Sequence, residues 1–272
     1  MAAPPHLAWL VNTGKTLKTA DGHTVELWEL KHGNDPAVLS AWAEHFREHY
    51  CDDKLLQQLV NGTGLTNREF LIQRKFPDAN NAPGPSIRAG DFAEIIVADY
   101  IEYILGYWCP RKLRYDYKFN RNESTKGCDV IGFKFITDDT EHPKDELFVF
   151  EAKAALSGAK PVQRLQNAID DSNKDKLREA LTLNALKQRF LERGEKAPAT
   201  KVERFQNETD KPFIRISGAA AIHDDKTFDG ALIGGTTAKS HFNVANLKLI
   251  VVTGSMLMTL VHALYERAAD EA

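Results

Sequence analysis

Two carboxylates and one lysine stand on two neighbouring strand-like segments of this 272-residue chain. Asp129 begins the first segment, and Glu151 and Lys153 follow the apolar run 147–150 in the second. Residues two apart in a strand point to the same side, so Glu151 and Lys153 share a face and Ala152 points away. If the two strands pair, Asp129 joins them. We therefore expect two carboxylates and an ammonium group around one small volume.

This combination of groups suits the hydrolysis of phosphodiester bonds with a divalent cation. Mg²⁺ prefers oxygen ligands, and it commonly binds one or two carboxylates together with water and phosphate oxygens. The bound cation polarises the phosphoryl group and lowers the pKa of a bound water. A lysine beside that water stabilises the negative charge that develops. We expect Asp129 and Glu151 to bind Mg²⁺ or Mn²⁺, and Lys153 to orient the attacking water.

The spacing of these residues resembles the motif of the PD-(D/E)xK nuclease superfamily, with Cys128 where a proline usually stands. The acid-x-Lys triplet alone is weak evidence, because Asp52-Asp53-Lys54 and Asp224-Asp225-Lys226 match it too. Only Glu151-Ala152-Lys153 ends a strand-like apolar run and has an acidic partner upstream. The alternative is a surface salt bridge at a strand end, which contributes little stability. The context favours the nuclease interpretation.

The order of the expected elements predicts an α/β protein with a restriction-endonuclease-like core, a mixed central sheet flanked by helices. Hydrophobic periodicity predicts a helix at 88–107, strands at 113–119, 129–136 and 147–155, a long helix at 162–192, strands at 213–221 and 246–252, and a helix at 255–268. Helix, three strands, helix, strand is the core order of PD-(D/E)xK nucleases. Motif and element order therefore agree.

An N-terminal α+β extension precedes this core. We expect strands at 7–11 and 24–30 and a helix at 36–60. The segment 78–86, rich in Pro, Gly, Asn and Ala, has the composition of a linker. We place the domain boundary there, with residues 1–85 as a docking or regulatory extension and residues 86–272 as the nuclease-like domain.

The overall composition excludes several classes of protein. A net charge of −3 argues against a protein that coats nucleic acid through its total charge. The three cysteines form no CxxC pair, which favours reduced thiols over a disulfide framework or a zinc knuckle. The N-terminus lacks the pattern of a signal peptide, and no apolar run is long enough to cross a bilayer. We expect a cytoplasmic protein that does not bind membranes.

A helix carboxylate is the expected third acidic member of the site. Glu94 lies in the helix before the strands, a position from which nucleases of this superfamily often bring a carboxylate to the metal. Asp91, one turn earlier, is the substitute candidate. The alternative is a solvated glutamate on an amphipathic helix. The apolar neighbours Phe92 and Ile95 favour a position close to the core.

Basic and polar residues near the predicted site are candidates for contacts with DNA. Arg114, Lys118 and Lys126 belong to a locally basic stretch interleaved with aromatic residues, which suits a phosphate backbone. Gln163 and Arg164 stand at the end of the long helix that should face the site. For each residue taken alone a solvated surface position is the favoured interpretation, and only the cluster favours DNA.

A second motif leads to an alternative of a different class. His45, Glu48 and His49 match H-x-x-E-H, which binds zinc in inverted zincins. The chain has nine histidines, so a chance match is not surprising. The two histidines also flank an ordinary apolar stripe that includes Trp42 and Phe46. We favour a structural role and keep a zinc peptidase as the alternative.

A narrower resemblance covers roughly residues 86–272. The segments 88–96, 127–132, 150–154 and 164–190 are similar to the HamA family, the effector subunits of Hachiman anti-phage defence. The resemblance implies a bacterial, cytoplasmic, metal-dependent DNase that acts with a superfamily 2 helicase, HamB. It also implies that Asp129, Glu151 and Lys153 take the family's catalytic positions. The remaining alternative is a non-catalytic DNA-binding or sensor subunit built on a nuclease fold.

Overall fold

The central element of the fold is a mixed six-stranded sheet with the strand order β1-β2-β6-β5-β4-β3. The computed structural model describes residues 3–138 and 140–272. The strands are β1 (Leu10–Lys18), β2 (Thr24–Leu30), β3 (Val130–Lys134), β4 (Glu146–Ala155), β5 (Ile214–Asp224) and β6 (Leu247–Gly254). Strands β2, β6, β5 and β4 run parallel to one another, and the edge strands β1 and β3 are antiparallel to their neighbours.

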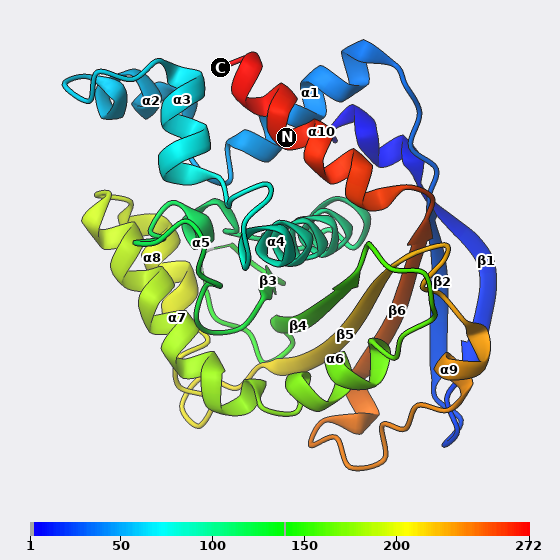
Figure 1. The fold of residues 1–272 in the computed structure, drawn as a ribbon. Helices are drawn as coiled ribbons and strands as arrows, with labels where there is room; N and C mark the ends of the chain where they lie inside the picture. Colours follow the sequence, from blue (N-terminus) through cyan, green and yellow to red (C-terminus); the bar gives the residue numbers. More distant parts are fainter. Residues whose placement is uncertain (1–2, 139) are drawn as a thin grey trace.

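Helices cover both faces of this sheet, which makes the protein α/β (Figure 1). The longer helices are α1 (Pro36–Arg47), α4 (Gly84–Asp99), α6 (Leu165–Ser172), α7 (Asp175–Glu192), α8 (Lys196–Glu203) and α10 (Leu257–Asp270). Shorter helical segments are η1 (Pro5–Trp9), α2 (Asp53–Val60), α3 (Asn67–Phe70), η2 (Leu71–Lys75), η3 (Tyr100–Ile104), α5 (Lys112–Tyr115), α9 (Gly230–Gly234) and η4 (Val244–Asn246). Helix α4 crosses one face, and α6 lies on the opposite face.

Strand β4 divides the core because its side chains alternate between the two faces of the sheet. Phe148 and Phe150 belong to the apolar cluster that contains Phe92 of α4. Val149 belongs to a second cluster, together with Leu183 of α7. The alternation continues to the end of the strand, so the odd-numbered residues that follow Val149 point to the side of α6 and α7.

Several expected elements are confirmed, with their ends moved by a few residues. The strands expected at 24–30, 129–136, 147–155, 213–221 and 246–252 correspond to β2, β3, β4, β5 and β6, and the last helix corresponds to α10. The strand expected at 7–11 is mostly wrong, because η1 covers residues 5–9 and β1 begins at Leu10.

The strand expected at 113–119 is wrong. Residues 112–115 form the short helix α5 instead. The edge strand β3 meets only a single bridge on that side in the described residues, between Trp108 and Phe133. The alternating pattern of this segment reflects ion pairs made by its basic residues rather than a sheet.

The two long helices expected at 36–60 and 162–192 are each broken in two. Residues 48–52 separate α1 from α2, where Asp52 caps the second helix. Asn173 and Lys174 separate α6 from α7. Hydrophobic periodicity is nearly continuous through such breaks, so it does not reveal them.

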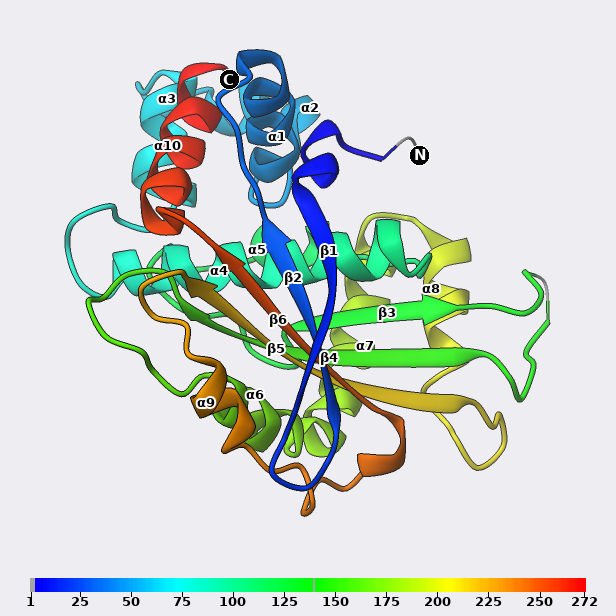
Figure 2. The same cartoon turned by 90° about the vertical axis from the view of Figure 1, so that its right-hand side faces the viewer.

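The N-terminal strands complete the same sheet that carries β4. Strand β2 pairs in parallel with β6 from Val25↔Leu249 to Glu29↔Thr253, as the side view shows (Figure 2). Residues from both sides of position 85, among them Trp42 and Phe92, share one apolar cluster. The division into a docking extension and a nuclease-like domain stays a prediction about function. In the described residues, no helix is long and apolar enough to cross a membrane.

Gly218 on β5 leaves the space that Phe150 of β4 fills. A Cβ atom at position 218 would lie 2.3 Å from Cδ2 of Phe150. We expect Gly218→Ala to lower the free energy of unfolding by about 1–3 kcal/mol, because the aromatic ring must move within a packed core. Urea denaturation measures this change.

Gly90→Ala is the matched control, because a Cβ atom there meets nothing within 4 Å and the residue lies within α4. It should raise stability by up to about 1 kcal/mol through helix propensity. Equal effects of the two substitutions would contradict the packing argument.

Candidate active site

The pairing of β3 with β4 brings Asp129 to Glu151. The antiparallel register sets Val130 opposite Phe150, so the preceding residue, Asp129, stands opposite Glu151. The backbone N–H of Ala152 donates to Oδ2 of Asp129 at 3.1 Å. The three residues of the predicted motif therefore gather at the end of the edge strand, as expected from strand alternation.

Lys153 lies between two carboxylates. Its Nζ donates to Oε1 of Glu151 at 2.6 Å and lies 2.8 Å from Oδ2 of Asp171 on α6. Burial alone lowers the pKa of an ammonium group, but here the charge of Glu151 and the hydrogen bond to Asp171 outweigh it and raise the pKa of Lys153. Lys153 is therefore a permanent cation and not a proton acceptor.

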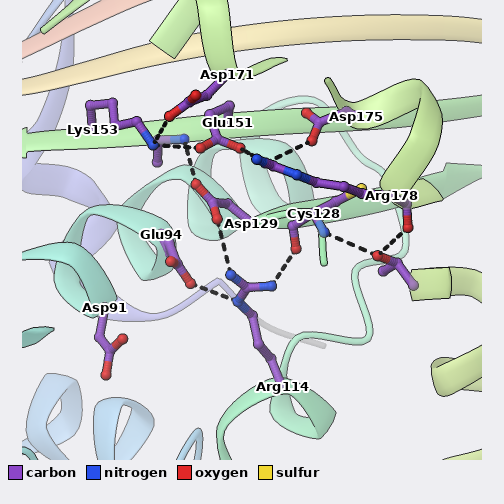
Figure 3. A network of polar contacts seen from close by, with 12 residues as sticks. Asp91, Glu94, Arg114, Cys128, Asp129, Glu151, Lys153, Asp171, Asp175 and Arg178 are labelled. Atoms are coloured by element: carbon purple, nitrogen blue, oxygen red, sulfur yellow. Dashed lines mark hydrogen bonds and ion pairs between the residues drawn. The ribbon is translucent and has the colours of Figure 1, made fainter. Parts of the chain in front are cut away.

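Arg114 of α5 connects the helix carboxylate to the strand carboxylate (Figure 3). Its Nε donates to Glu94 at 2.6 Å, and its Nη2 donates to Asp129 at 3.0 Å. Its remaining Nη1 donates to the backbone carbonyl of Cys128. Glu94 thus approaches the site from α4, as expected, but through a guanidinium group that sequence patterns did not indicate.

A third cation stands on the side of α7. Nη1 of Arg178 lies 3.4 Å from Oε2 of Glu151 and 3.5 Å from Oδ1 of Asp175. Asp175 begins α7 and is only 2% exposed. Figure 3 shows Asp175 beside Arg178 on the far side of Glu151 from Lys153. Asp171, Asp175 and Arg178 were not among the residues expected from the sequence.

The site therefore has more negative than positive charge in a mostly buried setting. Five carboxylates surround three cations, and the exposed Lys174 pairs with Asp171 as a fourth, so the acids outnumber the cations by one. Burial, with the neighbouring charges of Glu94 and Glu151, raises the pKa of Asp129 well above its usual range. Burial likewise raises the pKa of Glu151, although Lys153 offsets part of the effect.

The pKa of Asp175 is raised as well. Burial and the charge of Asp129 raise it to about 7, and Arg178 and the neighbouring Cys128 thiol offset only part of the shift. A carboxyl group with a raised pKa is one whose charge is poorly compensated by its surroundings. The shift therefore marks a place where additional positive charge would be favourable.

A cavity of about 460 Å³ adjoins the site on the side of α5. Its walls include Glu94, Arg114 and Asp129 from the site, and Lys126, Phe119 and Arg189 farther out. Phe119 is fully exposed. The cavity gives solvent and solutes a route to the carboxylates of Glu94 and Asp129.

The residues expected to contact DNA differ in their availability. Lys126 is exposed at the cavity wall. Arg114 is committed to two carboxylates, and Lys118 donates to Asp91 at 2.5 Å. Gln163 donates to the carbonyl of Leu232 at 2.7 Å, and Arg164 donates to the carbonyl of Ala154 at 3.1 Å. In this conformation Arg114 and Lys118 are paired with carboxylates, whereas Lys126 and Arg164 have no carboxylate partner among the described residues.

The alternative zinc motif does not converge on an open site. His49 is fully buried, and its Nδ1 donates to the carbonyl of His45 at 2.9 Å. Nε2 of His45 turns instead to Asp99, at 2.9 Å. Glu48 pairs with Lys112. The three side chains of the motif are directed to separate partners and do not converge on one point, so the structural interpretation of this motif is favoured.

His45 does belong to a compact buried cluster. Among the described residues, one group of three His, Cys, Asp or Glu side chains has its ligand atoms within 4.8 Å of one another, namely His6, His45 and Asp99. The guanidinium of Arg111 already lies there, 2.5 Å from Asp99 and 3.3 Å from His45. A metal ion would meet this positive charge. The cluster instead fastens the N-terminal segment to α4.

The residues of the candidate site fit a divalent cation in type and charge. All five acids offer hard oxygen ligands, which Mg²⁺ and Mn²⁺ prefer. The expected ligands Asp129, Glu151 and Glu94 are not gathered within the 4.8 Å that defines the cluster above, because Arg114 separates Glu94 from Asp129. Ion pairs hold the three carboxylates near one another, but their oxygens do not yet surround one common position.

The raised pKa of Asp175 predicts how stability depends on pH. The folded protein keeps this proton up to about pH 7, whereas the ordinary pKa is 3.8, so the free energy of unfolding falls as pH rises through that interval. Asp175→Asn imitates the protonated form. We expect the variant to match the parent near pH 4.5 and to exceed it by roughly 2–4 kcal/mol at pH 8.

Urea denaturation in EDTA at both pH values measures this difference. Asp170→Asn, at an exposed position on α6, is the control and should track the parent throughout. The same difference between Asp175→Asn and the parent at both pH values would contradict the prediction.

Comparison with known proteins gives one match. A protein-family model described as HamA matches residues 5–268, nearly the whole chain. Searches of curated proteins and of solved structures gave no match. The match extends the resemblance expected for residues 86–272 through the N-terminal strands, in agreement with their place in the shared sheet. The chain belongs to the HamA family, and its role is in anti-phage defence.

Proposed function

We propose that this protein is a metal-dependent deoxyribonuclease, the nuclease component of an anti-phage defence complex. The observation that carries the proposal is the convergence of Asp129, Glu151 and Lys153 at one end of the β3–β4 pair. These are the groups that phosphodiester hydrolysis requires, and buried carboxylates with raised pKa values concentrate at functional sites.

Within this proposal, Asp129 and Glu151 hold Mg²⁺ or Mn²⁺, and Glu94 contributes a third carboxylate. The cation, when bound, supplies Lewis-acid polarisation of the phosphate and a more acidic water. Lys153 stays protonated, so it donates hydrogen bonds to the attacking water or to a phosphate oxygen and stabilises the developing charge. Asp171 fixes the position of the ammonium group.

DNA would approach along the cavity beside α5. Lys126 offers a free positive charge at its wall, and Phe119 offers a fully exposed aromatic ring on which a base can stack. Arg114 can turn to a phosphate only after it releases Glu94 and Asp129. The bound divalent cation would replace the guanidinium as their counter-charge.

A helicase partner of superfamily 2, HamB, completes the proposal. The net charge of −3 gives the chain little general attraction for DNA. A partner that moves along DNA would load the substrate and restrain the nuclease until it meets phage or aberrant DNA. This part of the proposal depends on membership in the HamA family.

Lys153→Ala tests the catalytic assignment. We expect Mg²⁺-dependent cleavage of plasmid DNA, measured with the helicase present, to fall by about 10²–10³-fold, because the charge that stabilises the transition state is lost. Circular dichroism should report an unchanged fold. Lys160→Ala, which removes an exposed lysine from the loop after β4, is the matched control and should cleave like the parent.

Cleavage by Lys153→Ala at the parental rate would refute the assignment. If Lys153→Ala also preserved phage protection in cells, the non-catalytic DNA-binding or sensor subunit would become the better interpretation.

A further inference from the structure

Asp175 is a buried carboxylate whose oxygens have no N–H or O–H hydrogen-bond partner in the described residues, and the neighbouring Cys128 thiol is only a weak donor. The residue is 2% exposed. Glu94, Asp129, Glu151 and Asp171 all accept hydrogen bonds from a neighbouring cation or N–H group. Burial of an ionised group without hydrogen bonds is costly, so such a group calls for a specific explanation.

The neighbourhood of Asp175 points to the candidate site. Oδ1 of Asp175 and Oε2 of Glu151 flank the same nitrogen of Arg178, at 3.5 and 3.4 Å. The side chains of Asp175 and Glu151 reach this nitrogen from α7 and β4, as Figure 3 shows. Two carboxylates separated by one cationic group form a place that a divalent cation can take.

An ion pair with Arg178 does not by itself account for Asp175. Charge-assisted hydrogen bonds between a guanidinium and a carboxylate are typically about 2.7–2.9 Å long, and the contact here is longer. The side chain of Arg178 is also 33% exposed, so it can turn into solvent without being desolvated elsewhere. The buried carboxylate has no such freedom.

We propose that Asp175 is a metal ligand of the candidate site, which together with Glu151 binds a divalent cation in place of the Arg178 guanidinium. The chemical class of the ligand is a hard divalent cation such as Mg²⁺ or Mn²⁺, because both donors are carboxylates. This inference rests on the proposed function and adds to it a ligand that the acid-x-Lys motif does not contain.

Binding of Mn²⁺ to the full-length protein tests the proposal without relying on catalysis. The loss of the free Mn²⁺ signal in electron paramagnetic resonance gives the number of sites and their affinity. We expect Asp175→Asn to lose one site or to bind at least tenfold more weakly. Asp170→Asn, the same change at an exposed position five residues earlier, should bind within twofold of the parent.

Thermal unfolding separates a ligand from a merely structural acid. If Asp175 binds the cation, Asp175→Asn should unfold in EDTA at the same temperature as the parent or higher, and it should lose most of the upward shift that Mn²⁺ produces. A structural ion pair predicts the reverse, a lower unfolding temperature in EDTA with the Mn²⁺ shift retained, and that result would overturn the proposal.

Arg178→Gln gives an independent test if Asp175→Asn folds poorly. Removal of the competing guanidinium should tighten Mn²⁺ binding several-fold, and weaker binding would contradict the exchange of cations. The cleavage assay, run in parallel, distinguishes the two proposals. If the parent protein cleaves DNA but Asp175→Asn binds Mn²⁺ as the parent does, only the assignment of Asp175 as a ligand is refuted. If Mn²⁺ binding depends on Asp175 but the protein never cleaves DNA, only the proposed nuclease activity is refuted.

Discussion

The candidate site depends on the attraction between five partly or fully buried carboxylates and the three cations placed among them. Without Arg114, Lys153 and Arg178 these acids would repel one another in a setting that solvates charge poorly. The cations come from α5, β4 and α7. The same ion pairs therefore hold both the site and the elements around it, and they leave a net negative charge that suits a divalent cation.

Strand β4 connects this electrostatic arrangement to the packing of the core. Its even-numbered residues, such as Phe150, pack beneath α4, and this fixes the direction in which Glu151 and Lys153 point. A shift of register by one residue would turn the even-numbered side chains away from α4 and point the odd-numbered ones, including Glu151 and Lys153, towards it. Gly218 admits the Phe150 ring closely, so the packing of an aromatic side chain helps to set the register of the site.

The parts of the site on strands were predictable, and those on helices mostly were not. Alternation along a strand is a local rule, so Glu151, Lys153 and their partner Asp129 followed from spacing alone. Glu94 was reached through the resemblance to nucleases. Asp175 was not predicted, because its position beside Glu151 depends on the break between α6 and α7, which hydrophobic periodicity does not reveal.

The segment expected as a strand at 113–119 shows a different limit. Its alternation of aromatic and basic residues satisfies the pattern of a strand, but Arg114 gains more from Glu94 and Asp129 than from a place in a sheet. Tertiary ion pairs of this kind override local propensity. The prediction of a strand at 113–119 failed beside the charged residues of the candidate site, and functional sites are where local rules are most often broken.

The distribution of partners among the acids indicates where a metal ion changes the protein most. At Glu94 and Asp129 an arriving cation must displace the Arg114 guanidinium, which already makes two ion pairs and a hydrogen bond to Cys128. The loss of these three interactions reduces the free energy gained when the cation binds. Beside Asp175 the cation displaces only the two long contacts that Arg178 makes with Glu151 and Asp175, and it supplies a ligand bond to a carboxylate that has no N–H or O–H hydrogen-bond partner in the described residues. The net benefit of a cation is therefore largest on the side of α7, opposite the acid supplied by α4.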